Sequence, residues 1–249
     1  MELPIFANNL RSSASWTTLL DQARAQWNDA ASPDQRAQLE PRLRMLQLLQ
    51  TMLRAGKTID EREAALLCLQ PVDPLNQSEP ACFIRAAKLI SAAASEPEAQ
   101  LTRGLLTNLY RTLAATEPGA EVIRQTETLA LNPAHNPVPV VLLSKLIDNA
   151  LDWFTTDSFG ELHIVEKAML VYLRMLDLQP VPTHHEPVAL LAASFYTERA
   201  GLPPLIIFAD DLNARRYPAV LESAFRMLTQ PLVEFMAENL TRTIQTVIQ

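Results

Sequence analysis

Apolar residues recur at intervals of three or four along most of the chain, the spacing that gathers them on one face of an α-helix. In the first half this pattern predicts helices over about 33–55, 58–69, 79–94 and 96–117, the last beginning at Ser95-Glu96-Pro97-Glu98. Ser32 with Pro33 is a helix start signal, and Gly56 is a typical stop signal. The first half is therefore predicted to be helical.

The same spacing returns in the second half, over about 143–154, 158–176, 188–200, 212–228 and 231–248. The segment VALLAASFYTERAG is apolar on nearly every side as far as Phe195, which indicates a central, buried helix. Gly201 ends that helix, and the following PPLIIF is expected to be extended. Asp210 and Asp211 precede the next helix, and we expect them to cap it.

The segment between these two halves changes its period. Over 122–129 the residues alternate with a period of two, and the β-branched ones among them favour a short strand or hairpin. Asn132-Pro133 and Asn136-Pro137 interrupt the pattern. The predicted fold class is thus all-α, a helical bundle with one short β-hairpin.

Composition narrows the classes of partner. The net charge of −7 argues against a nucleic-acid surface, which needs clustered Lys and Arg. No uncharged apolar run reaches the roughly 18 residues of a membrane span. The start MELPIFANNLRSS lacks the basic and apolar regions of a signal peptide, and we expect a bacterial, cytoplasmic protein. Cys68 and Cys82 lie in apolar helical patterns and are expected to be buried.

A Pro-rich segment, LDLQPVPTHHEPVALL (176–191), carries the adjacent pair His184 and His185. Neighbouring residues point about 100° apart on a helix, so one ion is not easily held by both. A zinc site would need two further ligands, and only Glu186 is close in sequence, with His163 one helix earlier. We expect a solvated or hydrogen-bonded pair and no metal, with a metal site as the open alternative.

Several stretches resemble the Fic family. RAGLPPLII (199–207), ARRYPAVLESA and PLVEFMAENL are similar to a family turn and two family helices, and GAEVIRQTETLALNP resembles the family's β-hairpin flap. The resemblance covers roughly residues 100–249 and implies a Fic-like helical bundle. On this basis 96–249 is predicted to be a Fic-like domain, and 1–95 a helical N-terminal region for packing or docking.

The resemblance implies a particular active-site loop, His-Pro-Phe-x-(Asp/Glu)-Gly-Asn-(Gly/Lys)-Arg, which transfers AMP from ATP. Its histidine is the base, its acid binds magnesium, and its glycines and arginine hold phosphates. Counting back from Gly201 places the loop on 179–187, QPVPTHHEP. The correspondence keeps the family's proline as Pro180, and the other positions of the degenerate loop hold, in order, Gln179, Val181, Thr183, His184, His185, Glu186 and Pro187.

These replacements remove the groups that the reaction needs. Gln179 has no basic nitrogen, and Thr183 is a poor substitute for a carboxylate on magnesium. Because residues before proline avoid helical angles, Glu186 is expected as an N-cap or pre-helix residue. Its carboxylate would then repel a phosphate at the helix N-terminus. We therefore expect no catalytic residue, no cofactor, no nucleotidyl transfer and no ATP binding.

The leading hypothesis is a catalytically inactive Fic-like protein that acts through contact with a protein partner. The resemblance implies that the flap pairs with an extended target segment by strand addition. The expected contact residues are Val122, Ile123, Arg124, Gln125 and Thr126. The alternatives are an enzyme with altered phosphate-transfer or metal-dependent chemistry at 179–187, and a purely structural subunit.

Overall fold

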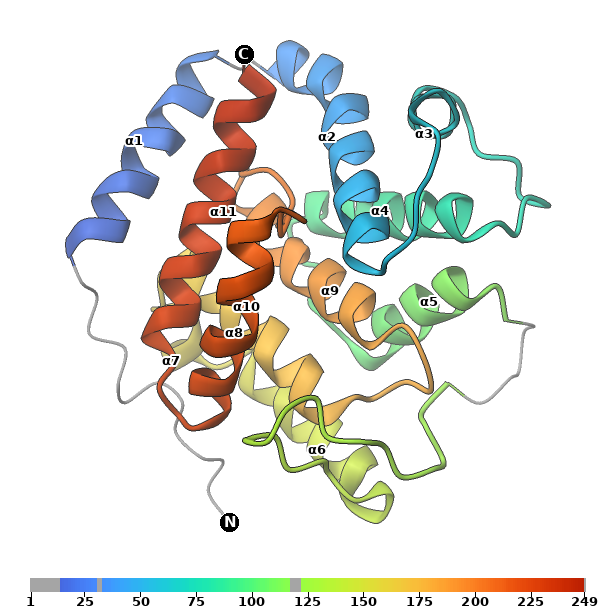
Figure 1. Ribbon diagram of the computed structural model, residues 1–249, viewed down its shortest axis with the longest axis vertical. Helices are drawn as coiled ribbons and strands as arrows, with labels where there is room; N and C mark the ends of the chain where they lie inside the picture. Colours follow the sequence, from blue (N-terminus) through green and yellow to red (C-terminus); the bar gives the residue numbers. More distant parts are fainter. Residues whose placement is uncertain (1–13, 31–32, 117–121, 249) are drawn as a thin grey trace.

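The computed structural model describes residues 14–30, 33–116 and 122–248, and within them the chain is helical without a β-strand. This confirms the all-α prediction. The helices, in chain order, are α1 Ala14–Ala30, α2 Pro33–Arg54, α3 Glu61–Leu69, α4 Glu79–Ser95, α5 Arg103–Ala114, α6 Val140–Trp153, α7 Asp157–Gly160, α8 Ile164–Leu178, α9 His185–Arg199, α10 Asp211–Phe225 and α11 Gln230–Ile248 (Figure 1). No described helix combines the length and the apolar character of a membrane span.

Some predicted helix starts are right and one is wrong. Asp210 caps α10 by accepting a hydrogen bond from the Asn213 N–H, as predicted. The signal at Ser95-Glu96-Pro97-Glu98 does not start a helix, because Ser95 is instead the last residue of α4. Helix α5 begins at Arg103, where the Thr102 hydroxyl accepts from the Leu105 N–H at 3.2 Å. A side-chain acceptor thus sets this start, and the carboxylates do not.

Helix α1 is not among the individually predicted elements, yet it belongs to the core. It packs along α11, and its Trp16 and Trp27 side chains are buried (Figure 1). The indole Nε1 of Trp27 donates to the Gly201 carbonyl at 2.9 Å. The first helix is thereby tied to the turn that follows α9.

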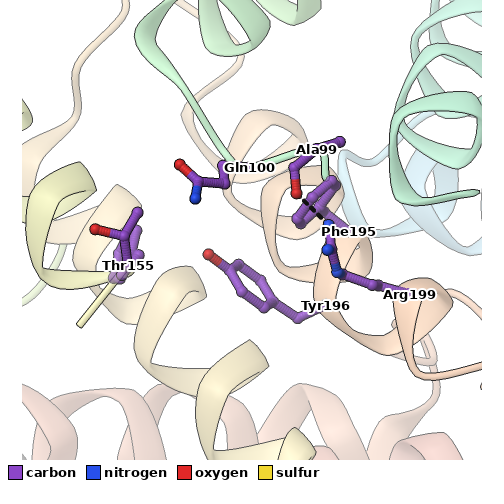
Figure 2. A pocket seen from close by; sticks show the side chains of 7 residues that line it. Ala99, Gln100, Thr155, Phe195, Tyr196 and Arg199 are labelled. Carbon is purple, nitrogen blue, oxygen red and sulfur yellow. Dashed lines mark hydrogen bonds between the residues drawn. The ribbon is translucent and has the colours of Figure 1, made fainter. Parts of the chain in front are cut away.

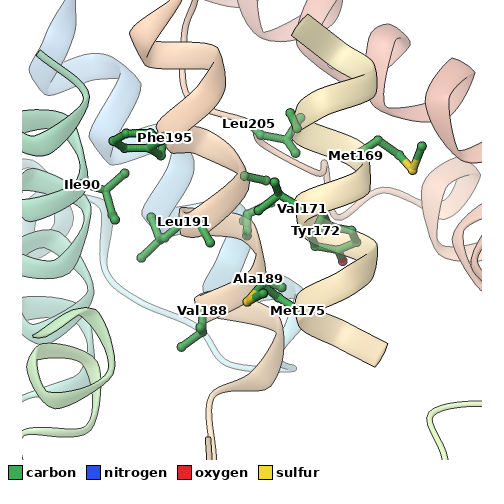
Figure 3. Packing of buried hydrophobic residues seen from close by; sticks show 14 of the residues in the cluster. Ile90, Met169, Val171, Tyr172, Met175, Val188, Ala189, Leu191, Phe195 and Leu205 are labelled. Atoms are coloured by element: carbon green, nitrogen blue, oxygen red, sulfur yellow. The ribbon is translucent and has the colours of Figure 1, made fainter. Parts of the chain in front are cut away.

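The antiparallel pair α8 and α9 forms the centre of the molecule. One end of α9 meets the hinge from α8, and its last turns border a small pocket (Figure 2). Side chains of the two helices interlock between them, and Ile90 of α4 lies on the other side of α9 near Leu191 and Phe195 (Figure 3). Residues 188–195 are all buried, which matches the predicted central helix.

The chain after α9 forms neither helix nor strand over 202–209. Gly201 takes a φ of 73°, a left-handed value that suits glycine after a helix. The buried Ser194 hydroxyl then accepts from the Leu205 N–H at 3.0 Å. In the same way, the Asn239 amide oxygen accepts from the Phe208 N–H at 3.1 Å. Two buried polar side chains therefore accept main-chain N–H groups that a neighbouring strand would bind in a sheet.

The predicted β-hairpin is not found in 122–139, and residues 117–121, where the flap was expected to begin, lie outside the described ranges. The side chain of Arg124 is buried, and its guanidinium donates to the main-chain carbonyls of Gln179 and Val138. Side-chain hydrogen bonds therefore hold this segment where strand pairing was predicted. Further along, a turn closed by the His135 N–H and the Asn132 carbonyl (3.1 Å) replaces the second strand. Prolines at 133, 137 and 139 remove donors that a ladder would need.

Candidate functional site

The hinge between α8 and α9, residues 179–184, is turned sharply at both ends. Gln179 and His184 take left-handed φ values of 43° and 58°, which are uncommon for residues other than glycine. The Gln179 side chain is buried, and its Oε1 has no hydrogen-bond partner within the described structure. A buried acceptor without a donor costs about 1–3 kcal/mol, so the surrounding packing must hold the hinge in this shape.

The predicted loop residues split between the hinge and α9. Pro180 and Val181 are buried with Gln179, and Thr183 is exposed. Helix α9 begins at His185, so Glu186 lies inside the first turn, and its prediction as an N-cap or pre-helix residue is wrong. The helix can start before Pro187 because N–H groups in the first turn have no partner within the helix, and proline loses nothing there.

The carboxylate of Glu186 is held by groups from three other helices. Arg54 at the end of α2 forms an ion pair with it, and the Tyr172 hydroxyl of α8 donates to its Oε1 at 3.1 Å. The hydroxyl of Tyr217 in α10 lies 2.5 Å from that of Tyr172. The Arg54 guanidinium also stacks over the Tyr217 ring, 4.4 Å from its centre. We call these four residues the Glu186 cluster.

The protonation states in the Glu186 cluster follow from burial and charge. Burial raises the pKa of both Tyr172 and Tyr217, and the Glu186 carboxylate raises each further. Burial lowers the pKa of Arg54, but the Glu186 carboxylate, together with Tyr172 and Tyr217, more than offsets this, so the net shift is upward. Both tyrosines therefore keep their protons at neutral pH, while Arg54 keeps its charge.

Sequence reasoning placed only Glu186 of these four in the site. Tyr217 falls within ARRYPAVLESA, which was assigned as a helix, and Tyr172 fell on the apolar face of α8. Arg54 comes from the region before residue 96, which carries no resemblance. Its contact with Glu186 spans 132 positions of sequence, and no local pattern could have indicated it.

His184 at the end of the hinge and His185 at the start of α9 have different surroundings. The His184 Nδ1 lies 2.8 Å from the Thr183 hydroxyl, which in turn lies 3.4 Å from the Tyr110 hydroxyl. The Nδ1 of His185 is buried without a partner in the described structure. Burial lowers the pKa of both imidazoles, and for His185 the positive Arg124 lowers it further. Both rings are neutral at pH 7, and the two imidazoles share no hydrogen-bond partner in the described structure.

A metal site at His184, His185 and Glu186 was the alternative left open, and the structure brings no further ligand to these residues within the described ranges. Within the ranges that are described, no three His, Cys, Asp or Glu residues gather in a way that could hold an ion. His163, considered as an additional ligand, is the N-cap of α8, where its Nδ1 accepts from the Val165 N–H at 3.3 Å. That is the end of α8 opposite the hinge, about 20 Å away by helix rise.

The five predicted contact residues do not share one environment. Val122 and Arg124 are buried, Ile123 is half-buried, and Gln125 and Thr126 are exposed. The Arg124 Nε donates to the Gln179 carbonyl at 2.8 Å, and its main-chain N–H donates to the Pro180 carbonyl at 3.1 Å. Arg124 thus fastens this segment to the hinge, a role that its place in an alternating pattern did not indicate.

Little space is left between this segment and the hinge. A cavity of about 20 Å³ lies among Val122, Ile123, Pro180, Val181 and Val188. A single water molecule requires about 10–15 Å³ on the same measure. The segment therefore packs directly on the hinge.

Comparison with known proteins bears on the fold. No family model and no curated protein matches the sequence. Solved structures do match in three dimensions. A Fic domain-containing signaling protein from Bacteroides thetaiotaomicron is similar at a TM-score of 0.78 with 16% identity, over 92% of this chain and 96% of that one. Fic-1 from C. elegans is similar at 0.72 with 18% identity, over 93% and 71%. A Fic family protein from Desulfovibrio desulfuricans G20 is similar at 0.66 with 16% identity, over 99% and 74%.

The chain has the Fic fold. The similarity extends over more than nine-tenths of the chain, so it includes the helices before residue 96 that carried no resemblance in sequence. In this fold, the hinge and the first turn of α9 are where the sequence register placed the Fic loop. The residues found there are a buried amide, a threonine–histidine pair and a glutamate already bound to arginine.

Proposed function

We propose that this Fic-fold chain is a catalytically inactive protein that acts by binding a protein partner. The observation that carries the proposal is the position of the Glu186 carboxylate in the first turn of α9. Helix N-termini favour anions, and this is the place that a nucleotide phosphate would take. Here the chain supplies its own anion, and Arg54 and Tyr172 already bind it.

The surface proposed to bind the partner is the exposed stretch 125–131. Within the described structure, none of the main-chain N–H groups of 125–130 donates a hydrogen bond. Leu129 and Leu131 of the same stretch are exposed, at 87% and 40%. Free donors beside apolar side chains suit an extended peptide that adds its own main chain alongside. A partner segment of extended, apolar character would fit.

The first test asks whether the site takes a nucleotide. Thermal unfolding and isothermal calorimetry of the full chain with ATP, ADP or CDP-choline plus Mg²⁺ should show no stabilisation, since a ligand of the native state must raise stability. Transfer of radiolabelled AMP to the chain or to added proteins should also be absent. A dose-dependent rise in Tm with nucleotide and Mg²⁺ would reject the inactive function.

The second test addresses the binding surface. Retention of a partner on the immobilised chain should be lost with Gln125→Lys together with Thr126→Lys, and kept with His184→Ala or His185→Ala. Gln70→Lys is the matched control, because Gln70 is also exposed but lies after α3. If His184→Ala or His185→Ala releases the partner and the 125–126 variant does not, the contact surface does not lie in 125–131.

A second candidate function rests on the contact between Thr183 and His184. An exposed hydroxyl 2.8 Å from a neutral imidazole is the pair that base-assisted nucleophilic chemistry uses. An active pair would transfer the acyl group of p-nitrophenyl acetate to the Thr183 oxygen as p-nitrophenolate leaves, while His184 takes the hydroxyl proton. Mass spectrometry of the treated chain would then show acetylated Thr183 in the parent and none in His184→Ala.

A further inference from the structure

The exposed stretch 125–131 is attached to the rest of the protein at its two ends. At its start, Arg124 donates to main-chain carbonyls of the hinge. At its end, the Leu131 N–H donates to the Nδ1 of His135 at 3.0 Å. Between these contacts, the main-chain N–H groups of 125–130 donate no hydrogen bond within the described structure. The two ends of the stretch are therefore set by Arg124 and His135.

The His135 imidazole is fully buried, and each ring nitrogen has one hydrogen-bond partner. Nδ1 faces the Leu131 N–H, which can only donate, and Nε2 lies 3.1 Å from the Asp177 carbonyl, which can only accept. The proton of the neutral ring must therefore be on Nε2. The ring also stacks on Phe225, the last residue of α10, with 4.6 Å between ring centres. A neutral His135 thus joins the stretch to both α8 and α10 with its two nitrogens satisfied.

A proton added to His135 would go to Nδ1, the ring nitrogen that carries none. Nδ1 would then be a donor that faces the Leu131 N–H, which is also a donor. The hydrogen bond would be lost, and the two N–H groups would repel each other. Histidine is the side chain whose charge ordinarily changes between pH 5 and 8, whereas arginine keeps its charge over this range. A change of pH can therefore release the Leu131 end of the stretch and leave the Arg124 end attached.

The charged groups near the ring come from α8 and α10. The Asp177 carboxylate lies 3.9 Å from Nε2, and Arg174 forms an ion pair with the same carboxylate. Burial raises the pKa of Asp177 more than Arg174 and His135 lower it. On α10 the ring meets Phe225, and the next residue, Arg226, is in an exposed ion pair. Because Arg174 already neutralises Asp177, the carboxylate compensates little for the contact that an imidazolium would lose.

The stretch contains one acidic residue, Glu127, which makes a further contact. Its Oε1 accepts from the Val140 N–H at the start of α6, at 3.1 Å. Carboxylates ordinarily gain a proton at about pH 4, and imidazoles do so at about pH 6.5. A comparison between pH 7.5 and pH 5.5 therefore addresses the histidine and not this carboxylate.

We propose that His135 is a pH-sensitive latch on the stretch 125–131. The neutral imidazole holds the Leu131 end in place, and protonation frees that end while Arg124 keeps the other attached. The latch rests on the proposed function in one respect, because 125–131 is the surface proposed to bind a protein partner. A freed stretch must be ordered again when the partner binds, so affinity is higher at neutral pH than in mild acid.

Amide hydrogen exchange of the full chain at pH 7.5 and pH 5.5, corrected for the intrinsic effect of pH on exchange, tests the latch. Protection of the Leu131 N–H should fall by about tenfold in acid, the equivalent of about 1.4 kcal/mol. Protection of α9 should change less. His135→Asn keeps an acceptor near the position of Nδ1 and does not titrate, so its Leu131 N–H should be equally protected at both pH values. Ring ¹⁵N shifts of the parent should show Nδ1 gaining a proton over the same range.

His163→Asn is the matched control, because it removes an imidazole at the opposite end of α8 and leaves His135 in place. The acid response at Leu131 should persist in this variant. Equal protection of Leu131 at both pH values in the parent, or a response of the same size in His135→Asn, overturns the latch. If His135→Asn does not fold, a parent Nδ1 that stays unprotonated at pH 5.5 overturns it. These measurements use no partner, so they can fail while the proposed function stands, and an absent partner would not change them.

Discussion

The Glu186 carboxylate interacts favourably with two features of its surroundings, the N-terminus of α9 and the Arg54 guanidinium. It sits in the first turn of a fifteen-residue helix, where the helix dipole favours a negative charge. It also neutralises Arg54, whose side chain is only 13% exposed. Losing the negative charge would leave a largely buried guanidinium without its partner, which is more costly than losing an exposed ion pair.

We expect Glu186→Gln to lower the free energy of unfolding by about 1–2 kcal/mol, toward the low end for a partly buried pair because the Glu186 side chain is 38% exposed. The glutamine keeps the size of the side chain and an acceptor for the Tyr172 hydroxyl, so the loss reports the charge. Urea unfolding at pH 7.5 measures it. Glu222→Gln removes the carboxylate of an exposed pair with Arg226 and should change stability by less than about 0.5 kcal/mol.

A double-mutant cycle with Arg54→Met separates the pair from its surroundings. If the two residues act mainly on each other, the double variant should be no less stable than the worse single variant. Additive losses would instead show that Arg54 contributes chiefly through its stacking on Tyr217, and the ion pair would carry no stability of its own.

At the scale of helices, the start of α8 depends on an unprotonated imidazole. The His163 Nδ1 accepts from the Val165 N–H, and the Glu166 carboxylate accepts from the His163 N–H in return, a capping box. The ring also meets Trp16 of α1 edge-on at 5.0 Å. Burial lowers the pKa of His163 more than Glu166 raises it. Protonation therefore costs the folded state an acceptor at the N-terminus of a central helix.

This gives a signed pH dependence. Because the pKa of His163 is lower when folded than its unfolded value of about 6.5, the unfolded chain binds more protons between the two values. The contribution is fully present above about pH 6.5 and is lost as the pH falls through the folded pKa; His184 and His185 act in the same direction. We expect the free energy of unfolding to fall between about pH 7 and pH 5.

His163→Asn keeps a capping acceptor and removes the titrating group. Urea unfolding of the parent and this variant across the same pH range should show a smaller acid loss in the variant. Equal acid losses in both would mean that the stability change comes from other groups, and that the cap of α8 does not respond to pH.

The segment 122–139 is held by one side chain more than by any pairing of strands. The Arg124 guanidinium reaches the carbonyls of Leu178 and Gln179 at the end of α8, and also those of Thr126 and Val138 in its own segment. Cations at a helix C-terminus satisfy carbonyls that lack partners within the helix. A single residue thus joins the segment to the hinge.

Arg124→Met should lower the free energy of unfolding by about 2–4 kcal/mol, since several buried carbonyls lose a charged donor. Amide hydrogen exchange of 122–139 should accelerate more than that of α9. Arg124→Lys should not restore the parent behaviour, because an ammonium cannot reach carbonyls in several directions as the guanidinium does. Gln125→Met, at an exposed neighbouring position, is the control and should change neither measurement.

Helix positions were the part of the fold that the sequence could predict best, because apolar spacing reports burial directly. The buried α9 and the Asp210 cap are examples. The period of two over 122–129 predicted a strand or hairpin that the structure does not have, because Arg124 is buried for its hydrogen bonds and not for apolar packing. The Glu186 cluster could not be predicted, since Arg54 meets Glu186 only through the packing of α2 on the rest of the molecule.

For the whole molecule, the region before residue 96 and the region after it share one core. Helix α4 covers one side of α9, where its Ile90 faces Leu191 and Phe195 (Figure 3). The α4 residues Phe83, Ile84, Ala87 and Ile90 are almost completely buried. Helix α1 packs along α11, and its two tryptophans are buried. The buried Arg44 of α2 also forms an ion pair with Glu198 of α9 at 2.6 Å. Removing residues 1–95 would expose both apolar faces and leave Glu198 without its cation.

We therefore expect the fragment 96–249 to lack a cooperative thermal transition and to associate, whereas the full chain unfolds in one step. Circular dichroism melting and size-exclusion chromatography of both would show this. Burial of α9 from every side is what makes it a stable helix despite its lack of a polar face, and the α4 side is lost in the fragment. A monomeric 96–249 with a sharp transition would mean that the region after residue 95 folds by itself. The Arg54–Glu186 contact would then be a docking interaction between two units and could open without unfolding either, which would make the anion site at the start of α9 accessible.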